Sequence, residues 1–158
     1  MRDRAMPHWR GAVAAACVLA ACLWFLAAHA RAAPMGHAAR AVNVVEQARL
    51  HLVSKSGSDL LEKGSASGSL PGSVTAQFTV TPLRVSGLVT IYPRGGSLTI
   101  RILGSPRSFG INASFAGTMS VIGGTSRYAH ARGGGTFSGT VNRRSWAATV
   151  TARGRLSY

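Results

Sequence analysis

Acidic residues and cysteines are the residue types that this chain most conspicuously lacks. Its 158 residues include four Asp and Glu and two Cys, against 18 Lys and Arg. So few carboxylates disfavour a metal site built from oxygen ligands, and also a hydrolase that works with a pair of carboxyl groups. Charged residues make up only 14% and the mean hydropathy is +0.16, which is not typical of a disordered chain. The length is that of one domain with a short extension.

The N-terminal region has the three parts of a secretory signal peptide. Three arginines provide a positive start, the stretch 11–28 is uncharged and mostly apolar, and small residues follow at the spacing of a cleavage site. The sequence therefore predicts a secreted, extracellular protein exported from a bacterium. We expect a signal peptide over residues 1–32, a flexible lead-in over 33–42 and the folded domain over 43–158. The alternative is a lipoprotein, because the four residues that end at Cys22 resemble a lipobox.

Both cysteines, Cys17 and Cys22, lie inside the predicted signal peptide. Cleavage near Ala32 leaves a mature chain without cysteine, which excludes a disulfide scaffold, a thiolate metal site and a cysteine nucleophile together. The remaining histidines and acids do not have the spacing of metal ligands, so we expect neither a metal nor a cofactor. Stability must then come from an ordinary hydrophobic core.

The predicted mature chain is strongly basic. From Ala33 onwards it has fourteen basic residues and three acidic ones, a net charge of +11. Such a charge favours anionic partners: nucleic acid, an envelope polymer or lipid headgroups. The arginines are scattered singly, apart from Arg143 and Arg144, and they do not alternate with stacking aromatic residues. This scatter disfavours specific nucleic-acid binding.

Beyond residue 42 the apolar residues recur with a period of two, which is typical of strands rather than helices. The clearest case is 74–81, where apolar side chains alternate with threonine and glutamine. Segments rich in glycine, proline and serine separate such stretches. The sequence predicts eight strands, at 44–53, 60–70, 74–81, 86–92, 97–103, 111–121, 133–141 and 145–157.

Eight meandering strands can remove their free edges by closing into a barrel. The faces expected to point inward carry small and branched residues with single aromatics. In the last strand, for example, Trp146, Ala148 and Leu156 share one face. Small inward residues suit a tapering or hollow interior. The predicted fold class is therefore all-β, a single eight-stranded antiparallel β-barrel.

The segment Val121–Gly133, with the sequence VIGGTSRYAHARG, resembles a motif of dirigent proteins and allene oxide cyclases. In that family the motif is V-x-G-G-T-G-x-(F/Y)-x-x-A-R-G, and a glycine-led strand like the one that starts at Gly96 precedes it. The likeness extends over about residues 60–141, and its specific part is the motif of about thirteen residues. The chain departs from the motif at Ser126, where the family has a second turn glycine.

The resemblance implies an allene oxide cyclase- or dirigent-like (calycin-like) barrel that encloses an apolar pocket, often in a homo-oligomer. Members of the family guide reactive organic intermediates by confinement, without a bound cofactor and commonly with acidic residues in the pocket. This chain has no acidic residue after Glu62. Within the motif we expect Gly123 and Gly124 to form a turn that other residues resist. Tyr128 would close one end of the barrel, and Arg132 would hold a carbonyl or the C-terminal strand.

We expect the barrel to bind a small apolar or aromatic ligand, and to guide a reactive intermediate as the resembled family does. Four aromatic side chains would line the pocket and two polar ones would orient the ligand at its mouth: Tyr92, Phe115, Phe137, Trp146, Asn112 and Arg132.

His51 and His130 could meet Glu46 or Asp59 as base and orienting acid, although a lone strand histidine is more often an exposed polar residue. The serines lack a G-x-S-x-G elbow. The sequence does not decide whether the protein is an enzyme.

Two other functions fit the composition. A basic cell-surface protein would bind an anionic envelope polymer or lipid through its outer face, without catalysis, and this binding would weaken as salt rises. A small outer-membrane barrel is the third possibility. It would need apolar outward faces and aromatic girdles, whereas the expected outward faces carry threonine, arginine and serine.

Overall fold

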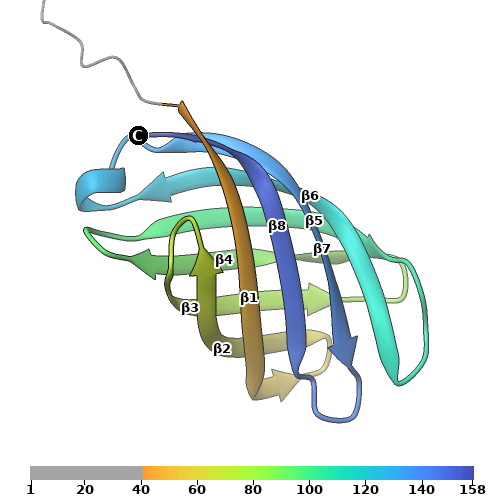
Figure 1. The fold of residues 1–158 in the computed structure, drawn as a ribbon. Coiled ribbons are helices and arrows are strands. Elements are labelled where there is room, and N and C mark those ends of the chain that lie inside the picture. The colour runs from red at the N-terminus through yellow and green to blue at the C-terminus, as the bar shows by residue number, and fades with distance from the viewer. Residues whose placement is uncertain (1–40) are drawn as a thin grey trace, which may run out of the picture. The chain divides into compact units, whose positions relative to one another are not determined.

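The computed structural model describes residues 41–158, which form one β-barrel (Figure 1). The predicted signal peptide, the alternative lipid site at Cys22 and most of the predicted lead-in lie outside the described residues. A single turn of 3-10 helix, η1, spans Ser126–Tyr128. No helix in the described residues is long and apolar enough to cross a membrane. The strands are β1 Ala41–Ser56, β2 Asp59–Gly68, β3 Gly72–Val80, β4 Val85–Pro93, β5 Leu98–Pro106, β6 Asn112–Gly124, β7 Arg132–Asn142 and β8 Ala148–Ser157.

The barrel is closed, and each strand is antiparallel to both of its neighbours. The first and last strands complete the closure, because β1 pairs with β8 from Ala41–Ser157 to Leu50–Ala148, and the two lie side by side in Figure 1. The predicted all-β fold with eight antiparallel strands in a closed barrel is confirmed. Every predicted strand is present, because the period of two extends through each of them.

The strand boundaries differ from the predicted ones by up to three residues, and β1 and β8 show why. β1 is longer than the predicted 44–53 at both ends, and a register shift between Leu52 and Ser54 lets it continue to Ser56. β8 begins at Ala148 rather than at residue 145. Trp146 has a φ of 57°, which is left-handed backbone rather than the extended backbone of a regular strand, and this residue lies in the turn between β7 and β8.

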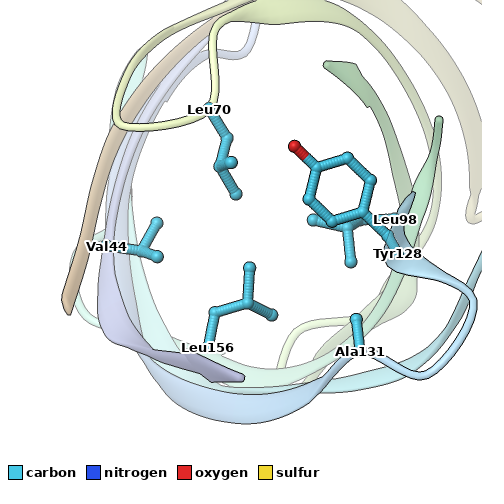
Figure 2. Close-up of a cluster of buried hydrophobic side chains, with 6 residues drawn as sticks. All are labelled: Val44, Leu70, Leu98, Tyr128, Ala131 and Leu156. Atoms are coloured by element: carbon cyan, nitrogen blue, oxygen red, sulfur yellow. The ribbon is translucent and has the colours of Figure 1, made fainter. Parts of the chain in front are cut away.

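The barrel has two unlike ends. At one end, which we call the closed end, β1 and β8 meet the β2–β3, β4–β5 and β6–β7 connections. Figure 2 shows six buried side chains there that point toward one another across the interior. Tyr128 is the aromatic residue among them and only 3% exposed, so the expectation that it closes one end of the barrel is confirmed. The six residues are Val44, Leu70, Leu98, Tyr128, Ala131 and Leu156.

The middle of the barrel is filled by branched and small side chains, which alternate along each strand with outward-facing residues. Val74 and Ala76 of β3 and Ala148 of β8 are buried in one cluster. Phe137 of β7 is buried in a second cluster with Val85 and Ile102. The other end, where β5 passes into β6 and β7 into β8, has no such plug, and we call it the open end.

The VIGGTSRYAHARG segment forms the corner between β6 and β7, and its glycines do not form the predicted turn. Gly123 and Gly124 are the last residues of β6, where Gly124 pairs with Leu98, and neither has a positive φ. The left-handed residue is Ser126, with a φ of 52°, at the position where the resembled motif has glycine. Gly124 has a different role, because a Cβ there would lie 2.4 Å from the carbonyl oxygen of Tyr128.

The outward faces of β7 and β8 carry polar residues. Thr149, Arg153 and Arg155 of β8 are among them, and they alternate with inward Ala148 and Leu156. On these two strands an apolar inward face and a polar outward face are the reverse of a transmembrane β-barrel, whose lipid-facing side is apolar. The third function considered from the sequence is therefore not favoured by the distribution of side chains on these strands.

Candidate functional site

A cavity of about 400 Å³ opens at the open end of the barrel. Its walls come from strands β2, β3, β4, β6, β7 and β8, and its rim comes from the loops that connect them. The lining is mostly apolar. The inward wall residues are Leu60, Glu62, Phe78, Val80, Val85, Ala113, Phe115, Val141 and Ala148, and the rim includes Pro82, Pro106, Phe109, Arg143 and Trp146.

Alternation along the strands explains why these residues meet. Leu60 and Glu62 are two apart on β2, and Phe78 and Val80 are two apart on β3, so each pair shares the inward face. Leu60 pairs with Phe78 and Glu62 pairs with Ala76, which fixes the order of the side chains across the wall. The cavity persists because several inward positions near it are small, as at Ala113 and Ala148.

Glu62 is a carboxyl group inside this apolar cavity. Its side chain is 2% exposed, and its Oε2 atom is buried with no hydrogen-bond partner in the described part of the chain. Desolvation by burial raises the pKa of Glu62 from 4.5 to about 7. The group therefore changes between a hydrogen-bond donor and a charged acceptor near neutral pH, and it can exchange a proton with a molecule held beside it.

Glu46 is the second buried carboxyl group, and its surroundings are different. Its Oε1 atom accepts a hydrogen bond from the backbone N–H of Leu70, which lies in the connection between β2 and β3 near the closed end. Burial raises the pKa of Glu46, and hydrogen bonds from the backbone of Leu70 and Ser69 oppose this rise. Both carboxyl groups have an Oε2 atom without a hydrogen-bond partner among the described residues, but Oε1 of Glu46 holds the β2–β3 connection. We therefore assign Glu46 the role of fixing this connection, and Glu62, which lines the open cavity, is the better candidate for contact with a ligand.

No protein-family model, curated protein or solved structure matches this chain. What the cavity does must therefore be inferred from its own geometry and chemistry. Two properties stand out: the cavity reaches the surface at one end of a closed barrel, and Glu62 is the acidic residue among its lining side chains. An apolar cavity with one ionisable group of shifted pKa is typical of a binding or active site.

The structure brings two of the six predicted site residues to the cavity. Phe115 points inward from β6 and lines its wall, and Trp146 lines its rim from the β7–β8 turn. Phe137 also points inward, but it is packed in the core beside Val85 and Ile102 and is not among the residues that line the cavity. Phe115 and Phe137 are in tilted aromatic contact, with ring centroids 6.1 Å apart, so Phe137 supports the wall from behind.

The other three predicted residues are not among those that line this cavity. Tyr92 is 49% exposed on the outer face of β4, because its neighbours in the strand face inward. Asn112 is exposed at the start of β6, where its Oδ1 accepts a hydrogen bond from Asn142 Nδ2 at 3.1 Å. Arg132 is exposed at the closed end, and its backbone oxygen, not its guanidinium, accepts a hydrogen bond from Ser157 Oγ at 3.3 Å.

The histidines do not combine with the acids to form a catalytic group. His51 is exposed on the outer face of β1, whereas Glu46 of the same strand points into the barrel. His130 is exposed in the β6–β7 connection, beyond η1. Asp59 is bound instead by Thr79, whose Oγ1 donates to Asp59 Oδ1 at 2.7 Å. Within residues 41–158 no group of three or more His, Cys, Asp or Glu side chains could hold a metal ion.

Glu62 was not among the predicted site residues, although the sequence contains a signal for it. Glu62 lies two residues after Leu60 and four before Ala66, so the alternation that buries these apolar residues also turns Glu62 inward. The glycines and serines of this strand obscured the pattern. The rim residues Pro82 and Phe109 have no comparable signal, because loops follow no period.

Proposed function

We propose that this protein binds a small, mainly apolar or aromatic ligand in the cavity at the open end of the barrel, and that it does so outside the bacterial cell. The observation that carries the proposal is a cavity of about 400 Å³ with an apolar lining and one buried carboxyl group, that of Glu62. Ligand pockets have volumes of ~300–1,000 Å³ and combine such linings with a few placed polar groups.

Glu62 indicates what kind of polar group the ligand carries. A buried carboxyl oxygen without a partner is costly, and a ligand group that bonds to it removes this cost. Below neutral pH the protonated carboxyl donates to an acceptor such as a carbonyl, ether or phenol oxygen. The best ligand is therefore an apolar molecule with a single oxygen function that reaches Glu62 when the apolar part fills the outer cavity.

A second candidate function is guidance of a reactive intermediate, in a homo-oligomeric barrel of the dirigent and allene oxide cyclase type. Glu62 favours this candidate, because a carboxyl group with a pKa of about 7 is suited to proton transfer near neutral pH. The motif likeness at Val121–Gly133 supports the same type of barrel. In this reading the cavity confines the intermediate, and Glu62 gives a proton to it or takes one from it.

Binding can be tested by titrating the full chain with the neutral fluorescent probe N-phenyl-1-naphthylamine. Ala113→Phe places an aromatic ring in the cavity, and Ala116→Phe places the same ring on the outward face of the same strand. We expect saturable binding that persists in 1 M salt, a loss of at least tenfold in affinity for the first variant and less than twofold for the second. Equal affinity of the two variants would show that the probe binds elsewhere.

The second candidate needs a separate experiment with phenoxy-radical and allylic epoxide substrates. Guidance predicts an excess of one product enantiomer in the presence of the protein. Glu62→Gln should remove this excess if it arises from proton transfer, while probe affinity stays within about threefold of the wild type, since the cavity keeps its shape. A racemic product with the wild-type protein would exclude guidance of these substrates and leave ligand binding as the function.

A further inference from the structure

The loops of the open end expose large apolar side chains. Leu83 in the β3–β4 loop is 86% exposed and Phe109 in the β5–β6 loop is 71% exposed, and no other large hydrophobic residue in 41–158 is exposed as much. Ile111 follows Phe109 in the same loop and is half exposed. Isolated apolar residues on a surface are ordinary, but projecting ones at the tips of two loops that rim one cavity mark an interaction surface.

The same end of the barrel is strongly basic. Five cationic side chains occupy its loops and the adjoining strand ends, and the acidic residue there, Asp59, accepts a hydrogen bond from Thr79. Apolar tips flanked by arginines are what an anionic interface between water and hydrocarbon requires, because the tips enter the hydrocarbon boundary while the arginines meet phosphate groups. The five cationic residues are Lys55, Arg84, Arg107, Arg143 and Arg144.

The closed end offers an internal comparison. It is also basic, with Arg94 and Arg132 exposed, but the exposed apolar residues nearest to it, Tyr92 and Ile122, lie on strand faces rather than at loop tips. Charge alone would therefore recruit both ends of the barrel to an anionic surface. Only the open end, in the described part of the chain, combines charge with projecting apolar side chains.

We propose that the open end of the barrel docks on an anionic lipid bilayer, with Leu83 and Phe109 inserted at the level of the headgroups and Arg84, Arg107 and Arg144 bound to lipid phosphates. This docking requires only the side chains of the loops and does not depend on a ligand in the cavity. If the cavity does bind an apolar ligand, docking places its mouth against the hydrocarbon, so that the ligand passes between bilayer and barrel without crossing water.

The test measures partition of the full chain onto sedimenting vesicles of neutral phosphatidylcholine, with and without 30% anionic phosphatidylglycerol. Arg84→Glu/Arg144→Glu reverses two charges at the open end, and Arg94→Glu/Arg101→Glu makes the same change in net charge elsewhere. An arginine near an anionic surface strengthens binding about fivefold, so we expect the first variant to lose at least tenfold and the second less than threefold. Circular dichroism confirms that each variant keeps the β-sheet spectrum.

Insertion of the apolar tip has its own pair of variants. Leu83→Gln should weaken partition at least threefold, whereas Leu88→Gln on the outer wall of β4 should leave it unchanged. Equal losses from the two charge variants would overturn the proposal, since they would show a general polyanion effect. Wild-type affinity of Leu83→Gln, together with full competition by heparin, would equally overturn it and identify an anionic polymer as the partner. Any binding by the N-terminal segment is common to all variants and cancels in these comparisons.

Discussion

Replacing the buried carboxyl of the cavity, by Glu62→Gln, should change how stability depends on pH. The folded chain holds the Glu62 proton more tightly than the unfolded chain does, because burial raises its pKa from 4.5 to about 7. Stability from this group is therefore full below pH 4.5 and falls as the pH rises to about 7. The difference in pKa corresponds to about 3 kcal/mol. Because the cavity opens to water, which weakens the effect of burial, we expect the wild type to lose only about half of this amount of stability when the pH is raised.

The assay is urea unfolding, followed by circular dichroism between pH 4.5 and 8. At pH 4.5 the free energy of unfolding of Glu62→Gln should match that of the wild type to within ~1 kcal/mol. When the pH is raised to 8, the difference between variant and wild type should shift by about 1.5 kcal/mol in favour of the variant, because glutamine cannot ionise. Glu46→Leu is the comparison: it removes the acceptor of the Leu70 N–H, so it should destabilise the protein even at pH 4.5. Parallel pH profiles for Glu62→Gln and the wild type would refute the reasoning, since they would show that Glu62 titrates as if in water.

Three further predictions concern the framework, and each is measured by urea unfolding at constant pH. Ser126→Gly should stabilise the protein by about 1 kcal/mol, because glycine adopts the left-handed backbone of this corner without strain; no gain would mean that the serine is not strained. Gly124→Ala should cost about 2 kcal/mol, because its Cβ would collide with the Tyr128 carbonyl, while Gly123→Ala, with open space around it, should stay within ~0.5 kcal/mol; equal effects would contradict this assignment. Phe137→Ala should cost about 3–5 kcal/mol through the void it leaves in the core, and a loss below ~1 kcal/mol would show that the core collapses to fill it.

The barrel could be predicted from the sequence because its physics is local and periodic. Alternating apolar residues indicated which face of each strand is buried, and strands joined in sequence by turns have few ways to remove their edges other than closure. The inward orientation of Phe115, Ala148 and Leu156 follows from this alternation alone. Tyr128 could be placed at an end because it follows a strand and a glycine pair.

The site could be predicted only in part, because residue type is a weaker guide to a pocket than position in the strand. Tyr92 is aromatic, yet it lies between buried Ile91 and Pro93 and so points outward. Glu62 is acidic, yet it shares the inward face with Leu60. The rim could not be predicted at all, since it depends on how loops from distant parts of the sequence converge.

The pairing of β1 with β8 has a consequence for how the chain reaches this structure. Ten residue pairs join the first strand to the last, so β1 has an unsatisfied edge until the C-terminal residues are available. Contacts between residues so distant in sequence form slowly, and an open edge of this kind can pair with another chain in the meantime. A chain shortened by the ten residues of β8 would keep two such edges permanently, and we expect it to aggregate rather than to form a smaller barrel.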